Sequence, residues 1–82
     1  MSQEIEVAVE KMNHGHWLKV FIPYTSNTDM TATLRNNGGE TLKIVKLASG
    51  NNLIDIETIT IPSIQIKIDT QFETILKELI LQ

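Results

Sequence analysis

The sequence predicts an all-β protein, a small antiparallel β-sandwich of about seven strands and of immunoglobulin-like size. Apolar and polar residues alternate with period two in several segments, which is typical of strands that bury one face. Two segments, Asn36-Asn37-Gly38-Gly39 and Ser49-Gly50-Asn51-Asn52, have the Gly and Asn content of tight turns. The 82 residues are enough for a single domain, residues 1–82.

Two strands are expected before residue 25. The first, from Glu4 to Glu10, carries a row of Glu on one side, which suits the edge of a sheet. A polar connection, Lys11–Gly15, leads to the second strand, His16–Tyr24. Pro23 lacks a backbone donor, so this strand ends there or lies at an edge. In the first strand, Ile5, Val7 and Val9 share one side, and Glu4, Glu6, Ala8 and Glu10 take the other, with the Glu row outward. In the second strand, one face holds Leu18, Val20, Ile22 and Tyr24, and the opposite face holds Trp17, Lys19 and Phe21.

The segment Thr31–Glu57 predicts three strands joined by the two turns as hairpins. Gly adopts positive φ without steric cost and Asn tolerates it, as hairpin turns require. Residues 25–29 form a loop by composition. The inward residues of the first of these strands are Met30, Ala32 and Leu34. In Thr41–Leu47 the apolar pattern changes phase, which predicts a bulge near Ile44-Val45 or a strand covered on both faces.

The C-terminal third contains the clearest strand of the chain. A strand over Leu53–Thr58 and an apolar crossover, Ile59–Pro62, are expected before it. In that clearest strand Ile64, Ile66 and Ile68 alternate with Gln65, Lys67 and Asp69. The final segment, Phe72–Leu81, fits either a helical stripe or a strand. As a strand, its better face would hold Ile75, Lys77, Leu79 and Leu81.

Charge and composition exclude several classes of protein. The formal net charge is −3, from 7 Lys and Arg against 10 Asp and Glu, and the lysines are scattered, so nucleic acid is not an expected partner. There is no Cys, hence no disulfide and no thiolate site. No apolar run is long enough to span a bilayer, and the N-terminus lacks the features of a signal peptide. We expect a secreted or cell-surface location if the chain is a domain of a larger protein, and a cytoplasmic one if it is complete.

Few residues are candidates for binding. His14 and His16 would face the same way on a strand, a spacing that a metal site can use, although a solvent-exposed pair in a loop is the preferred explanation. Trp17, Phe21 and Tyr24 could form an aromatic platform for a sugar or a peptide, or cap one end of the core. Catalysis is not expected. Asp55 suits a carboxylate that accepts backbone bonds in a turn, and no serine stands in a nucleophile motif, so neither an active site nor a cofactor is predicted.

The residues from Met30 to Leu81 resemble the C-terminal sorting domain of the type IX secretion system of Bacteroidetes. Members of that family are small seven-stranded β-sandwiches at the ends of secreted proteins. The family's first motif is an apolar strand, an Asn, a Gly and a second strand; Leu34, Asn36, Gly39 and Leu42 match it. Its next turn and apolar-Asp-apolar strand are matched by Ser49, Gly50, Asn51, Asn52, Ile54, Asp55 and Ile56, and its following loop by Ile59.

The resemblance implies a role and a structure for the tail. It implies a strand over Thr74–Leu81 and a handle that transport machinery reads, with a cargo attached. Family tails often end in Lys-rich strands, so Lys77 is the candidate contact here. The chain departs from the family at Pro62-Ser63-Ile64, where a Gly-apolar-Tyr box is common, and at Phe72-Glu73, where the last turn usually has Gly. The alternative hypothesis is a stand-alone module that binds a protein or a glycan, with a homodimer through an exposed edge as one arrangement.

Overall fold

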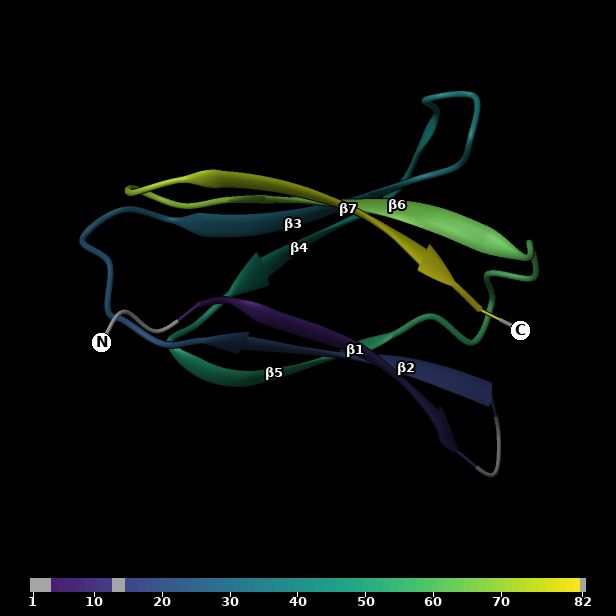
Figure 1. Cartoon of the computed structure of the whole chain (residues 1–82), viewed down its shortest axis with the longest axis horizontal. Helices are drawn as coiled ribbons and strands as arrows, with labels where there is room; N and C mark the ends of the chain where they lie inside the picture. The colour runs from purple at the N-terminus through teal and green to yellow at the C-terminus, as the bar shows by residue number, and fades with distance from the viewer. Residues whose placement is uncertain (1–3, 13–14, 82) are drawn as a thin grey trace. The chain divides into compact units, whose positions relative to one another are not determined.

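The chain is all-β, with seven strands in two antiparallel sheets, as the sequence predicts (Figure 1). The computed structural model describes residues 4–12 and 15–81. Two compact units divide the chain: Met1–Thr25 with Ala48–Thr60, and Ser26–Leu47 with Ile61–Gln82. The first unit holds a sheet of order β1-β2-β5 and the second a sheet of order β4-β3-β6-β7. The strands are β1 (Glu6–Met12), β2 (Gly15–Ile22), β3 (Met30–Arg35), β4 (Thr41–Leu47), β5 (Gly50–Asp55), β6 (Ser63–Asp69) and β7 (Thr74–Ile80).

In the three-stranded sheet β2 is central, and β1 lies at the edge that its row of Glu predicts. The β1–β2 ladder continues until Met12 pairs with Gly15, so the expected polar connection Lys11–Gly15 is wrong in extent. Gly15, the first residue of β2, is in a conformation that favours glycine. It has φ of +126°, and a Cβ there would lie 2.9 Å from Cγ of Glu57. The strand β2 ends at Ile22, immediately before Pro23, which confirms the predicted effect of the proline.

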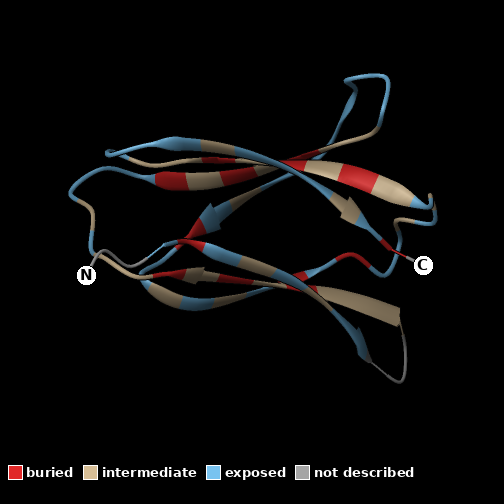
Figure 2. Ribbon diagram, viewed as in Figure 1, coloured by how far each residue is buried: buried red, intermediate tan, exposed pale blue. Residues whose placement is uncertain are grey.

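Buried residues occupy every second position of β2, β3 and β6, which confirms the predicted alternation in these strands. In the three-stranded sheet Leu18, Val20, Ile22 and Ile54 are buried, as are Ile5 and Ile56 directly beside the ends of β1 and β5, whereas Val7 and Val9 on β1 are half-buried. In the four-stranded sheet β3 and β6 are the central strands, and they contribute Met30, Ala32, Leu34, Ile64, Ile66 and Ile68. Figure 2 shows this alternation as red bands separated by tan ones. Burial of branched aliphatic side chains at every second position is therefore the main stabilising term of each sheet.

The strand β4 is an edge strand, and its irregularity lies elsewhere than predicted. Leu34 pairs with Lys43, but the next residue of β3, Arg35, pairs with Thr41, so Leu42 is the extra residue of a bulge. The predicted position near Ile44-Val45 is wrong. The alternative, a strand covered on both faces, is also wrong, because Ile44 is 66% exposed.

The second Gly-Asn turn joins the two sheets instead of closing a hairpin, which corrects the expectation of three hairpin-linked strands. β4 belongs to the four-stranded sheet, whereas β5 pairs with β2 in the three-stranded one. The side chain of Asn52 stabilises this corner. Its Oδ1 accepts from the backbone N–H of Ala48 at 2.8 Å, and its Nδ2 donates to the carbonyl of Ala48 at 2.8 Å and that of Val20 at 3.2 Å. The Asn52 side chain thus supplies hydrogen-bond partners to backbone groups of Ala48 and Val20.

The C-terminal segment is a strand, so the helical alternative is wrong. β7 pairs with β6 along its whole length: Ile80 lies opposite Ser63 at one end of the ladder, and Thr74 lies opposite Asp69 at the other. The reversal between them depends on Thr70, whose N–H donates to the carbonyl of Glu73 at 2.9 Å and whose Oγ1 accepts from the N–H of Glu73 at 3.1 Å. The expected crossover Ile59–Pro62 is confirmed, since it connects β5 in one sheet to β6 in the other.

Candidate binding surfaces

A mixed aromatic and acidic surface covers the three-stranded sheet on the side opposite its buried residues. Trp17, Lys19 and Phe21 form the central row of this surface on β2. The cross-strand neighbours on β1 are Glu10 beside Trp17, Ala8 beside Lys19 and Glu6 beside Phe21. Those on β5 are Asp55, Leu53 and Asn51 in the same order. We call these nine residues the aromatic face.

The charge of the aromatic face is negative around Trp17. Glu10 and Asp55 stand on its two sides in the ladder, while Lys19 is the single cation among the nine residues. Carboxylate and amide groups beside an indole ring can accept or donate hydrogen bonds to a ligand that stacks on the ring. Leu53, which is 58% exposed, adds apolar area next to Lys19. The face therefore combines the groups that recognise a sugar ring or a cationic side chain.

The structure places Trp17 and Phe21 on the same face of β2, whereas Tyr24 lies outside that strand. Trp17 and Phe21 are half-buried and lie four residues apart on one face of β2, which corresponds to about 13 Å along the strand. Tyr24 lies beyond the end of β2, in the bend that follows Pro23, and is also half-buried. A row of this length fits an extended ligand better than a single ring.

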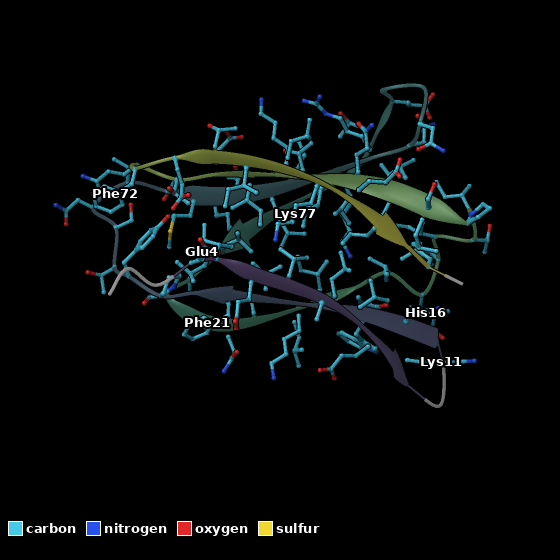
Figure 3. The ribbon with its side chains drawn as sticks, in the orientation of Figure 1. Glu4, Lys11, His16, Phe21, Phe72 and Lys77 are labelled. Carbon is cyan, nitrogen blue, oxygen red and sulfur yellow. The ribbon has the colours of Figure 1, made fainter. Side chains whose placement is uncertain are left out.

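His16 is on β2 opposite Lys11 and is half-buried (Figure 3). His14, the other member of the predicted pair, lies outside the described residues. Within residues 4–12 and 15–81 there is no group of three His, Cys, Asp or Glu side chains that could hold a metal ion.

The predicted turn residues have structural roles in the first turn. Oδ1 of Asn36 accepts from the N–H of Gly38 at 2.9 Å and from that of Glu40 at 3.0 Å. Gly39 has φ of +86° and donates its N–H to the carbonyl of Asn36 at 3.0 Å. An Asn side chain in this position satisfies the backbone donors that a tight turn leaves unpaired.

In the second turn, Asn51 and Asn52 have different roles from those predicted. Gly50 has φ of +90°, as expected for a turn glycine. Asn51, however, is an exposed residue within β5 that pairs with Phe21, so it belongs to the aromatic face. Asn52 makes the bonds that were expected of a turn residue, and the sequence signal was its position two residues after the glycine. Asp55 acts as predicted, because its Oδ1 accepts from the N–H of Glu57 at 2.8 Å.

An apolar row on the C-terminal strand escaped the sequence prediction. Phe72, Leu76 and Ile80 are each 62% exposed, and Leu76 and Ile80 occupy the side of β7 opposite its half-buried residues. Phe72 lies at the end of the hairpin formed by β6 and β7 (Figure 3). We call these three residues the β7 row. Their spacing of four residues was visible in the sequence, but it also fitted the helical stripe.

Lys77 occupies the inward parity of β7, where it pairs with Ile66. On the opposite edge strand, Lys43 pairs with Leu34 in the same row of the ladder. Both lysine side chains are exposed. A lysine at an inward position of an edge strand opposes indiscriminate strand addition, because pairing with another sheet would bury its charge.

Comparisons with family models, with curated proteins and with solved structures gave no match. The part of the chain that the structure describes contains no helix of the length and hydropathy needed to cross a membrane.

Proposed function

We propose that this chain is a non-catalytic recognition module that serves as a handle for export to the cell surface, as its resemblance to type IX sorting domains implies. The position of β7 carries the proposal. This strand is at the edge of the four-stranded sheet, where β6 is its one neighbour among the described strands. Its other edge offers backbone donors and acceptors to a protein that adds a strand.

The roles of the matched residues are consistent with this proposal. Asn36 and Gly39 build the turn between β3 and β4, and Gly50 opens β5 with a positive φ. These are conformational roles. Of the matched aliphatic residues, Leu34, Ile54 and Ile56 are buried, whereas Leu42 is 38% exposed. Two polar groups of this region, on Asp55 and Ser63, have structural partners. Asp55 accepts from Glu57, and Oγ of Ser63 is 3.2 Å from Nδ2 of Asn37.

The export of a reporter tests this proposal. A signal peptide and a reporter are fused ahead of the chain in a type IX-competent cell, and the reporter is measured on the surface and in the medium. We expect export that is lost when Thr74–Gln82 is deleted. Leu76→Lys, which places a charge in the β7 row but keeps the strand, should reduce export. Ile44→Lys is the matched control, because Ile44, on the other edge strand, is 66% exposed and Leu76 is 62% exposed. A folded reporter that stays in the periplasm would refute the handle role.

The aromatic face favours a second candidate function, binding of a protein or a glycan by a stand-alone module. Trp17 is the only tryptophan of the chain, so its fluorescence reports directly on a ligand at this face. Titration with oligosaccharides and with Lys- and Arg-rich peptides should change the emission of Trp17 in a saturable way. Phe21→Ala should weaken that binding, whereas Phe72→Ala, which removes an aromatic ring from the other unit, should not. A flat titration with every ligand would reject this candidate.

A further inference from the structure

The net charge of the chain is carried entirely by the unit that contains the aromatic face. The formal net charge is −3. The unit with the four-stranded sheet contains five acidic and five basic residues, whereas the unit with the three-stranded sheet contains five acidic and two basic ones. Three of those last five carboxylates, on Glu6, Glu10 and Asp55, belong to the aromatic face. This face therefore attracts a cationic partner.

Two of the three carboxylates are accessible to such a partner. Glu6 and Glu10 are exposed on the edge strand β1, and neither has an ion-pair partner among the described residues. On the other side of β2, Leu53 is 58% exposed. A ligand at this face thus meets unpaired negative charge and apolar area together.

The charges of the aromatic face alternate along β2. The ladder row of Trp17 contains two carboxylates, the row of Lys19 contains one ammonium group, and the row of Phe21 contains one carboxylate. Each acidic row has an aromatic ring at its centre. The order along the strand is therefore acidic and aromatic, then basic, then acidic and aromatic.

An extended peptide aligned with β2 repeats this spacing. Its alternate side chains point the same way, and four residues span about 13 Å. Side chains i, i+2 and i+4 of the peptide therefore lie over Trp17, Lys19 and Phe21 in turn. A cation at i or i+4 meets a ring and at least one carboxylate, whereas a cation at i+2 meets the ammonium group of Lys19.

We propose that the aromatic face binds an extended peptide segment with Arg or Lys at positions i and i+4 and Asp or Glu at i+2. Arg suits position i because its planar guanidinium stacks on the indole of Trp17 and donates to the carboxylates on either side. The acidic side chain at i+2 pairs with Lys19, so the preferred segment is not uniformly basic. This inference rests on the second candidate function, binding by a stand-alone module, and it specifies the ligand; it does not depend on export.

Two synthetic peptides test the pattern. Both have Arg at i and i+4 and Ser at the remaining positions, and they differ at i+2, where one has Glu and the other has Lys. The emission of Trp17, the only tryptophan, reports binding. We expect the Glu peptide to bind at least about threefold more tightly, because its Glu pairs with Lys19 whereas the Lys is repelled. Attraction by net charge alone would give the opposite order.

Variants of the protein test the assignment of each position. Lys19→Glu should reverse the order of the two peptides, a result that a general loss of stability would not produce. Glu10→Gln keeps the size of the side chain and should weaken binding of the Glu peptide about two- to fivefold. Glu78→Gln is the matched control and should leave binding unchanged, because Glu78 is exposed on an edge strand of the other unit. Circular dichroism verifies folding, and if Lys19→Glu does not fold, the peptide order and Glu10→Gln decide.

The outcomes separate this proposal from the function on which it rests. Equal binding of the two peptides, or tighter binding of the Lys peptide, would overturn the proposal. Saturable binding of the uncharged oligosaccharide maltohexaose with no binding of either peptide would also overturn it, but would leave the second candidate function standing. A flat titration with all three ligands would refute both.

Discussion

At the residue scale, one side chain and one backbone φ angle determine the conformation of the connection between β4 and β5. Asn52 links the backbone of Ala48, Gly50 and Val20 through one amide group, at distances between 2.8 and 3.2 Å. Each of these backbone groups would otherwise need another partner. The corner where the chain passes from β4 to β5 is consequently specified by one asparagine and one glycine.

Asn52→Ala should therefore destabilise the fold by about 1–3 kcal/mol, because the substitution leaves part-buried backbone groups without their partner. Asn51→Ala is the matched control, since Asn51 is the neighbouring residue and its side chain is exposed. Chemical unfolding in urea measures both. Equal midpoints for the two variants would show that the hydrogen bonds of Asn52 add nothing to the stability of the corner.

Gly39 and Gly50 should resist substitution for a conformational reason. Their φ angles are +86° and +90°, and a Cβ at either position would meet no atom within 4 Å, so the cost of a side chain is in the backbone alone. Gly39→Val or Gly50→Val should lower the free energy of unfolding by at least about 1 kcal/mol. Gly38→Ala, in the same turn but without a positive φ, should cost less. Unchanged denaturation midpoints for both Val variants would contradict this explanation.

At the scale of elements, the two central strands of the four-stranded sheet carry its core. Ile64, Ile66 and Ile68 on β6 are fully buried, and Ile66 and Ile68 pair with the buried Leu34 and Ala32 of β3. The edge strands differ, because β4 and β7 expose most of their side chains. Stability should therefore be concentrated in β3 and β6.

Ile66→Ala should destabilise the chain by about 2–5 kcal/mol, through lost burial and the cavity that remains. A domain of this size has roughly 3–5 kcal/mol of stability, so the variant should be largely unfolded at room temperature. Ile44→Ala serves as the control, because Ile44 is 66% exposed and its truncation should change little. Thermal unfolding followed by circular dichroism compares them, and a parental melting temperature for Ile66→Ala would place Ile66 outside the core.

The elements differ in how far the sequence could predict them. β3 and β6 were predictable because both have a buried and a polar side, and this imposes strict alternation. The partner of β5 was not, because a Gly-Asn turn suits a hairpin and a corner between sheets equally well, and only long-range pairing with β2 distinguishes them. The same holds for β7. Its apolar spacing fits both the helical and the strand periodicity. Only its pairing with β6, which is distant from the local pattern, shows that it is a strand.

The candidate surfaces were predictable in part. The side of β2 that carries Trp17 and Phe21 followed from alternation, but the acidic neighbours Glu10 and Asp55 depend on the registers with β1 and β5. Register is set by loop lengths and packing, so the composition of a strand does not fix it. The β7 row was hidden for a related reason. Its exposure depends on β7 being an edge strand, which is a property of the strand order.

At the scale of the whole molecule, each compact unit is assembled from two separate stretches of sequence. β5 reaches the first unit from beyond β3 and β4, and β6 and β7 reach the second from beyond β5. The ladders β2–β5 and β3–β6 both join the N-terminal part of the chain to the C-terminal part. Neither sheet can therefore be completed by one continuous half of the sequence.

Cutting the chain between Leu47 and Ala48 should consequently leave two fragments that do not fold alone. Residues 1–47 keep the β1–β2 and β3–β4 hairpins but lose the strands β5 and β6, against which the central strands β2 and β3 pair. Two-stranded hairpins are marginally stable in water. Each fragment should give a poorly dispersed amide NMR spectrum, and mixing the two should restore the dispersion of the intact chain. A dispersed spectrum from residues 1–47 alone would show that the long-range ladders are not needed for folding.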